Sequence, residues 1–257
     1  MSHVTTELNA GVLTLTVSRP EKLNALTDQM YGALADGLEQ AEADETIRVV
    51  LFQADGETYS AGNDLGDFAA QSDGKGPEVR QVERFLKGLA TATKPLMAAV
   101  QGKAVGVGTT MLLHCDYVIL ADDAQLIAPF INLALVPEAS SSLLMPARIG
   151  HVRAFEMFAL GEPVVATDAH AWGIANKVVS RDQLRSEAKR VATLLASKPA
   201  GAVALAKGLM RNPDAVLAQM DKESRIFAAQ LRSAEAKEAF QAFAEKRQPD
   251  FSRINKG

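Results

Sequence analysis

The chain has 257 residues, of which 47% are hydrophobic and 23% are charged, and its net charge is −4. This length and composition suffice for one large core, so we expect a soluble globular protein. Lys and Arg residues are scattered and are outnumbered by acidic residues. The sequence therefore argues against a nucleic-acid-binding protein and against a protein that binds an anionic membrane surface.

Cysteine usage and the N-terminal residues bear on the compartment. The one cysteine, Cys115, cannot form an internal disulfide and lies in an apolar run, so we expect a buried thiol and a reducing compartment. Residues 1–10 lack the basic start and apolar stretch of a signal peptide, and no apolar run is long enough to span a membrane. We expect a cytoplasmic protein.

The first third of the sequence reads as strand, helix, strand. Residues 12–17 alternate apolar and polar side chains, which predicts a strand with one buried face. Thr27 is suited to cap a helix whose apolar residues recur every three or four positions as far as Ala41. The continuous apolar run 47–52 predicts a strand that is buried on both faces.

The same order of elements then recurs. We predict a helix over 79–90, a strand over 96–100, a helix over 106–114, strands over 117–121 and 125–128, and a helix from about Glu138. Such alternation indicates an α/β domain with mostly parallel strands. Beyond about Ala166 the strand pattern fades, and we predict helices over 182–196, 201–210 and 214–244.

Two glycine-containing turns, residues 59–65 and 101–108, each follow a predicted buried strand. A helix that begins near Gly106 would direct unsatisfied N–H groups at a ligand, which suits a developing oxyanion. Taken alone, the glycines of both turns are more readily explained by packing. A dinucleotide-binding fingerprint is incomplete here, because Met111 stands where its third glycine would fall.

Other catalytic patterns are absent from the sequence. The four histidines show no metal-ligand spacing, so we expect no metal. Ser140, Ser141 and Ser142 suit the start of a helix better than nucleophilic catalysis, because no histidine adjoins them in sequence.

Glu138 follows an apolar segment that has no other ionisable residue, and this environment would make its carboxylate a better proton acceptor. It could also simply stabilise the first turn of a helix.

Several short motifs, taken in order, resemble the crotonase superfamily of enoyl-CoA hydratases and isomerases. They lie at residues 19–26, 60–65, 94–95, 102–108, 115–116, 137, 168–179 and 245–247. The resemblance implies an α/β fold, a crotonase-type spiral of ββα repeats over residues 1–195 with a C-terminal helical trimerisation region over residues 196–257. It also implies an acyl-CoA thioester substrate and a homotrimer or a dimer of trimers.

The resemblance further assigns residues to a site. The backbone amides of Asn63 and Val107 would form an oxyanion hole for the thioester carbonyl. Residues that would contact the substrate are Lys22, Leu23, Ala25, Ala61, Gly62, Asp64, Leu65, Gly106 and Phe130. Coenzyme A is part of the substrate, and no separate cofactor is implied. The polar segment 71–77 could shape the acyl pocket or form an ordinary surface loop.

The sequence departs from the hydratases at two positions. The two glutamates with which hydratases hold a water would fall at Thr110 and Phe130, so both carboxylates are missing. The stretch around Pro137 and Glu138 instead resembles peroxisomal-type Δ3,Δ2-enoyl-CoA isomerases, in which one glutamate directly follows a proline. The resemblance implies that Glu138 moves a proton from C2 to C4 of a 3-enoyl-CoA in fatty acid β-oxidation.

Other readings stay open at this point. Within the superfamily they are hydration, hydrolysis, or isomerisation of a ring-derived acyl-CoA. From a different class, the chain could be a non-catalytic acyl-CoA-binding protein.

Overall fold

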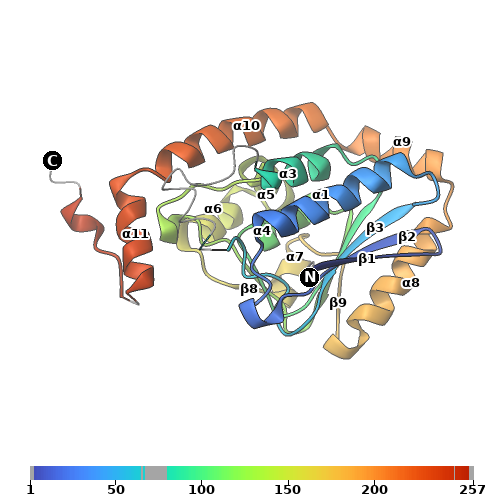
Figure 1. The fold of residues 1–257 in the computed structure, drawn as a ribbon, viewed down its shortest axis with the longest axis horizontal. Helices are drawn as coiled ribbons and strands as arrows, with labels where there is room; N and C mark the ends of the chain where they lie inside the picture. Colours follow the sequence, from blue (N-terminus) through green and yellow to red (C-terminus); the bar gives the residue numbers. More distant parts are fainter. Residues whose placement is uncertain (1–2, 65, 67–79, 246, 255–257) are drawn as a thin grey trace.

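A computed structural model describes residues 3–64, 66, 80–245 and 247–254 (Figure 1). Predictions that concern Leu65, the segment 71–77 and Lys246 lie outside these residues. The structure shows the helix predicted over 79–90 as α3 (Gln81–Thr91). Residue 79 also lies outside the described residues.

A six-stranded sheet forms the centre of the molecule, in the order β1-β2-β3-β4-β6-β9. Its strands are β1 (Val4–Asn9), β2 (Val12–Val17), β3 (Val49–Ala54), β4 (Leu96–Val100), β6 (Tyr117–Ala121) and β9 (Lys177–Val179). The first two form an antiparallel hairpin, and the other neighbours pair in parallel. Strands β3, β4 and β6 are buried almost throughout, as their continuous apolar runs require. The predicted α/β fold with mostly parallel strands is confirmed.

Helices cover both faces of this sheet (Figure 1). α1 (Asp28–Ala43) packs on α3 and on the first strands, and α8 (Leu184–Ala196) packs on the opposite face. Successive side chains of a strand point to opposite faces. Leu13, Leu15 and Phe52 therefore join the core under α1 and α3, while Leu51 and Met97 join the separate core under α8.

A second, three-stranded sheet carries the second glycine turn. It consists of β5 (Lys103–Val105), β7 (Gln125–Ile127) and β8 (Val164–Val165). After β5 the chain enters α4 (Val107–Thr110) and continues as the 3-10 helix η2 (Met111–His114). The helix predicted over 106–114 is thus present in two parts.

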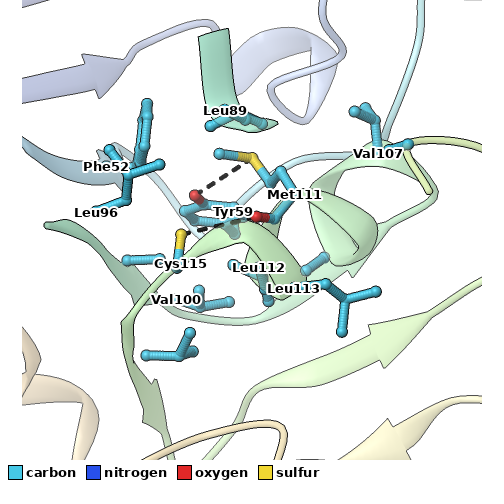
Figure 2. Close-up of a cluster of buried hydrophobic side chains, with 14 of the residues drawn as sticks. Phe52, Tyr59, Leu89, Leu96, Val100, Val107, Met111, Leu112, Leu113 and Cys115 are labelled. Atoms are coloured by element: carbon cyan, nitrogen blue, oxygen red, sulfur yellow. Dashed lines mark hydrogen bonds between the residues drawn. The ribbon is translucent and has the colours of Figure 1, made fainter. Parts of the chain in front are cut away.

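A buried cluster anchors this helical segment to the main sheet (Figure 2). The Tyr59 hydroxyl donates to Sδ of Met111, and Sγ of Cys115 donates to the Met111 carbonyl, both at 3.7 Å. Cys115 is buried as predicted, and burial raises the pKa of its thiol to about 12. Val107 lies at the edge of the same cluster, so the start of α4 is fixed by core packing.

The rest of the described chain is mainly helical. Its helices are α5 (Ser141–Ile149), α6 (His151–Leu160), α7 (Ala166–Ala171), α9 (Ala200–Met210), α10 (Pro213–Gln230) and α11 (Ala234–Ala244), with 3-10 turns η1 (Pro20–Lys22), η3 (Ile131–Leu133), η4 (Arg181–Gln183) and η5 (Phe251–Arg253). α10 packs on α3 and α5, and α11 extends to one side of the body (Figure 1). None of the described helices combines the length and apolar character needed to cross a membrane.

Two predicted helix boundaries were wrong. The helix expected from Glu138 begins at Ser141, because Ala139 and Ser140 both have φ of 59°, outside the helical region. The single helix expected over 214–244 is two helices, since Ser233 caps a new one by accepting from the Ala236 amide at 3.0 Å.

Candidate active site

The segment 19–26 lies against the first glycine turn and shares backbone hydrogen bonds with it. The amide of Ala61 donates to the Leu23 carbonyl at 2.9 Å, and the amide of Leu26 donates to the Gly62 carbonyl at 2.8 Å. The structure therefore brings together the predicted substrate-contacting residues of both segments. Leu23 is 57% exposed, so its side chain is available to a ligand.

The buried side chain of Asn24 holds the segment 19–26 in place. Leu23 and Asn24 have consecutive positive φ values of 52° and 56°. The Asn24 side chain is fully buried, and its Oδ1 accepts from the Arg19 amide at 2.7 Å. Its Nδ2 donates to the carbonyls of Asp55 and Thr58, both at 2.7 Å. The hydrogen bonds of Asn24 thus enforce a backbone conformation that is unfavourable for residues other than glycine.

Asp64, predicted to contact the substrate, has an ion pair within the protein. Its Oδ2 lies 2.7 Å from the Arg19 guanidinium, which also donates to the Ala25 carbonyl at 3.0 Å. Both charged side chains are mostly buried. The structure therefore gives the Asp64 carboxylate a part in joining the two segments.

The two glycine turns touch each other. The Ser60 amide donates to the Lys103 carbonyl at 3.1 Å, and the Val105 amide donates to the Ser60 carbonyl at 2.9 Å. Gly62 has φ of +89°, and a Cβ there would lie 3.0 Å from the Val105 carbonyl oxygen. A glycine is required for this approach. The contact brings the turn that contains Asn63 beside the turn that leads into Val107.

Asn63 and Val107 present amides that are not used for folding. Gly106 precedes α4, and its carbonyl accepts from the amides of Thr109 and Thr110 at 2.9 Å. Within the described part of the chain, neither the Asn63 amide nor the Val107 amide donates a hydrogen bond. Two free amides on adjoining turns, one of them at a helix start, can stabilise negative charge on a ligand oxygen.

Glu138 carries the carboxyl group of the site. It is half-buried, and the Thr110 hydroxyl donates to its Oε1 at 2.5 Å. Burial raises the pKa of Glu138 to about 7, with the Glu223 charge acting in the same direction and the Thr110 hydrogen bond opposing it. A carboxyl with this pKa can accept and return a proton near neutral pH.

Tyr31 lies beside both parts of the site. Its hydroxyl donates to Oδ1 of Asn63. Burial raises the pKa of Tyr31 well above its ordinary value, and the charge of Glu138 acts in the same direction. The phenol is therefore protonated at neutral pH and orients the Asn63 side chain.

The backbone that follows Glu138 is held by a buried histidine. Arg211 donates to Nδ1 of His114 at 3.1 Å, so Nδ1 is the acceptor and the proton is on Nε2. Nε2 then donates to the Ala139 carbonyl at 2.8 Å. Burial, together with the Arg211 charge, lowers the pKa of His114 to about 3. A neutral imidazole thus anchors the residue next to Glu138.

Phe130 is almost fully buried and packs against Phe158, with ring centroids 6.3 Å apart. Its contact with a substrate stays a prediction, as do those of Lys22, Ala25 and Gly106. In the part of the chain that the structure describes, no group of three or more His, Cys, Asp or Glu side chains could hold a metal ion.

Sequence reasoning missed three residues of this site. The sequence marks Thr110 only by the carboxylate that it lacks, although its hydroxyl donates to Glu138. Tyr31 fits the apolar face of α1 and resembles an ordinary core residue. Glu223 lies in a helix with many charged residues, and no local pattern distinguishes it from its exposed neighbours.

Comparison with known proteins adds independent information. Residues 7–254 match the enoyl-CoA hydratase/isomerase family. A solved enoyl-CoA hydratase/isomerase from Pseudoalteromonas atlantica T6c superimposes with a TM-score of 0.93 at 43% identity, over 97% of this chain and 99% of that one.

Two curated relatives carry isomerase names. The 1,2-epoxyphenylacetyl-CoA isomerase of Escherichia coli K12 is 35% identical over 98% of this chain and 99% of its own length. Enoyl-CoA delta isomerase 2 of Rattus norvegicus is 34% identical over 78% of this chain, but the match covers 52% of the rat protein.

Proposed function

The chain belongs to the enoyl-CoA hydratase/isomerase family of the crotonase superfamily, and within that family we propose that it is a Δ3,Δ2-enoyl-CoA isomerase. The resemblance found in the sequence and the crotonase fold are thereby confirmed, and the protein is an enzyme of this family. One observation carries the finer proposal. Glu138, whose pKa burial raises to about 7, accepts from Thr110, while Thr110 and Phe130 stand where a hydratase would have carboxylates.

The proposed reaction uses Glu138 as its one base. The thioester carbonyl of a 3-enoyl-CoA accepts hydrogen bonds from the amides of Asn63 and Val107. The Glu138 carboxylate takes a proton from C2, and the electrons delocalise over the dienolate. The protonated carboxyl then gives the proton to C4, which leaves a double bond between C2 and C3. Each oxyanion donor is worth about 3 kcal/mol in such a site.

Thr110 supports isomerisation rather than hydration. A hydratase must deprotonate a water and deliver it to C3, which requires a second base beside the first. The Thr110 hydroxyl donates its proton to Glu138 and cannot act as that base at neutral pH. It therefore stabilises and orients the single carboxylate.

The remaining substrate contacts belong to the same proposal. Lys22, Leu23, Ala25, Ala61 and Gly62 lie on the two joined segments, next to the first oxyanion amide, where the CoA arm would lie. Phe130, buried against Phe158, would close the acyl end of the site. The proposed proton transfer needs no cofactor, and coenzyme A takes part only as a portion of the substrate.

A second candidate function is isomerisation of a ring-derived acyl-CoA at the same site. The observation that favours it is the relative named 1,2-epoxyphenylacetyl-CoA isomerase, which aligns with 98% of this chain at 35% identity. The two candidates differ in the acyl group and not in the thioester that the amides would bind.

A substrate panel tests the proposal. The purified protein is assayed with 3-hexenoyl-CoA, 2-hexenoyl-CoA, 3-hydroxyhexanoyl-CoA and 1,2-epoxyphenylacetyl-CoA. We expect 2-trans-hexenoyl-CoA to form from the 3-enoyl substrate with kcat/KM at least ~100-fold above that of hydration, because the second base is missing. Faster hydration or faster conversion of the epoxide would contradict the assignment. Binding of all four thioesters without turnover would indicate a non-catalytic acyl-CoA-binding protein.

The proposed enzyme is a homotrimer or a dimer of trimers. Support comes from large apolar side chains that α9 and α6 leave exposed, among them Leu209 at 90%, Met210 at 81% and Val152 at 78%. Large apolar side chains left this exposed would be stabilised by burial against another subunit. Light scattering should give a mass of three or six chains, and a monomer at micromolar concentration would contradict this.

A further inference from the structure

Glu223 is a buried carboxylate that reaches the site from α10. Its residue is 4% exposed, whereas Asp221 and Lys222 beside it are exposed. It accepts hydrogen bonds from the Ser140 amide at 2.5 Å, from the Ser142 amide at 2.9 Å and from the Ser142 hydroxyl at 2.5 Å. All three partners are donors, which suits an ionised carboxylate.

These hydrogen bonds cap the N-terminus of α5 from a different helix. Ser140 is the N-cap residue of α5, but its own side chain makes no capping hydrogen bond. The first N–H groups of a helix need acceptors, and negative charge there is favourable. A local Ser or Asn side chain usually supplies such an acceptor at less desolvation cost than a buried carboxylate.

The capped residues directly follow Glu138. Ala139 alone separates Glu138 from Ser140, and the Ser141 amide donates to the Glu138 carbonyl at 3.0 Å. Ala139 and Ser140 both have φ of 59°, a conformation that persists only when the surroundings enforce it. His114 holds the Ala139 carbonyl, and Glu223 holds the Ser140 amide. The direction of the Glu138 carboxyl therefore depends on both anchors.

We propose that Glu223 is a positioning residue, which fixes from α10 the strained backbone behind Glu138 and so orients the proton-carrying carboxyl toward the substrate. The proposal rests on the proposed function, in which Glu138 is the base. It connects the C-terminal helices to the chemistry, because α10 holds the loop that carries the base.

The charge of Glu223 gives this role a measurable signature. It raises the pKa of Glu138, after burial as the main cause. The other groups that face Glu138 or its loop are Tyr31 from α1, the uncharged Thr110 from α4 and His114 from η2, whose pKa of about 3 keeps it neutral near pH 7. Removal of the Glu223 charge should therefore lower the pKa of Glu138.

The test compares Glu223→Gln with a matched control, Asp221→Asn, which removes an exposed carboxylate from the same helix. With 3-hexenoyl-CoA as substrate, kcat of Glu223→Gln should fall ~10-fold or more, because a small displacement of a reacting group is costly. KM should stay within about 2-fold, since no substrate contact changes. The midpoint of the acid limb of kcat/KM should move to lower pH, and Asp221→Asn should match the wild type.

If Glu223 only stabilises the fold by capping α5, the variants should behave differently. In that case Glu223→Gln would melt at a lower temperature but keep the wild-type kcat and acid-limb midpoint, and this result would overturn the proposal. If Glu223→Gln does not fold, Ser142→Ala decides. It removes the hydroxyl that donates to Glu223 and accepts from Gln219, and it leaves the Glu223 carboxylate in place. A kcat a few-fold below that of Asp221→Asn supports the proposal, and an unchanged kcat overturns it.

Glu138→Gln, measured in the same series, separates this inference from the proposed function. If Glu138→Gln keeps its turnover, the proposed function fails and the positioning role fails with it. If Glu138→Gln is inactive while folded Glu223→Gln behaves as the wild type, only the role of Glu223 is wrong.

Discussion

The Thr110 hydroxyl donates a 2.5 Å hydrogen bond to Oε1 of Glu138. Thr110 is the last residue of α4, and Val107 is the first, so one short helix carries both a proposed oxyanion amide and the partner of the base. Because the hydroxyl stabilises the ionised carboxyl, it lowers a pKa that burial raises. One short helix thus fixes the Val107 amide relative to the Thr110 hydroxyl that contacts Glu138.

Thr110→Val should raise the pKa of Glu138, because the charged form loses its hydrogen bond. The base must be deprotonated to act, so the acid limb of kcat/KM should move to higher pH. For a shift of one pKa unit, turnover at pH 7 should fall about 5-fold. The check is a pH profile with 3-hexenoyl-CoA.

Thr109→Val is the matched control for that profile. The Thr109 hydroxyl donates to the Ala104 carbonyl at 2.5 Å and lies away from Glu138 in the hydrogen-bond network. Its loss should cost about 1–3 kcal/mol of stability and leave the acid limb where it is. If the acid-limb midpoint of Thr110→Val stays where it is or moves to lower pH, the Thr110 hydroxyl does not lower the pKa of Glu138.

Glu138→Gln should stabilise the fold at neutral and higher pH. The folded-state pKa of Glu138 is raised from 4.5 to about 7. Below pH 4.5 the carboxyl is protonated in both states, and as the pH rises to about 7 the unfolded chain releases the proton more readily, which favours unfolding of the wild type. Each pKa unit is worth ~1.4 kcal/mol, so the variant should gain about 1–3 kcal/mol above pH 7.

Urea unfolding of both proteins from pH 4 to pH 8 measures this difference. Because every other titrating group is shared, the gap in unfolding free energy isolates Glu138. A gap that stays constant across the pH range would mean that the folded carboxyl titrates at its ordinary pKa.

Asn24→Ala should lower the free energy of unfolding by about 3 kcal/mol, because it leaves buried backbone groups without partners. The affected groups are the Arg19 amide and the carbonyls of Asp55 and Thr58. KM for the CoA substrate should rise, since Leu23 would lose its fixed position. Asn9→Ala, at an exposed position, should stay within ~0.5 kcal/mol of the wild type, and so small an effect at Asn24 would contradict the scaffold role.

The sequence predicts those strands and helices in which the burial of one or two faces gives the apolar residues a regular spacing. The alternation in β2 and the continuous apolar runs in β3 and β4 correspond to one and two buried faces. β1 escaped prediction because only Val4 of its six residues is buried, so its side chains carry no pattern. The break between α10 and α11 has no Gly or Pro to mark it, and it became visible only through the capping contact of Ser233.

In the candidate site, the sequence singles out Glu138 but does not predict which side chains contact it or its loop. Glu138 stands out because its neighbours are apolar, and its raised pKa agrees with that reasoning. Thr110 is 28 residues from Glu138, and Glu223 is 83 residues from Ser140. Only the packing of α4 and α10 brings these side chains to the base, and no local spacing encodes it.

The turnover number of Glu138→Gln with 3-hexenoyl-CoA tests the central claim most directly. Gln keeps the shape of the side chain and can still accept from Thr110, but it cannot take a proton from C2. We predict that kcat falls by about 10²–10⁴-fold, the usual contribution of a positioned base, while KM changes little. A variant that keeps most of the wild-type kcat would show that another group moves the proton.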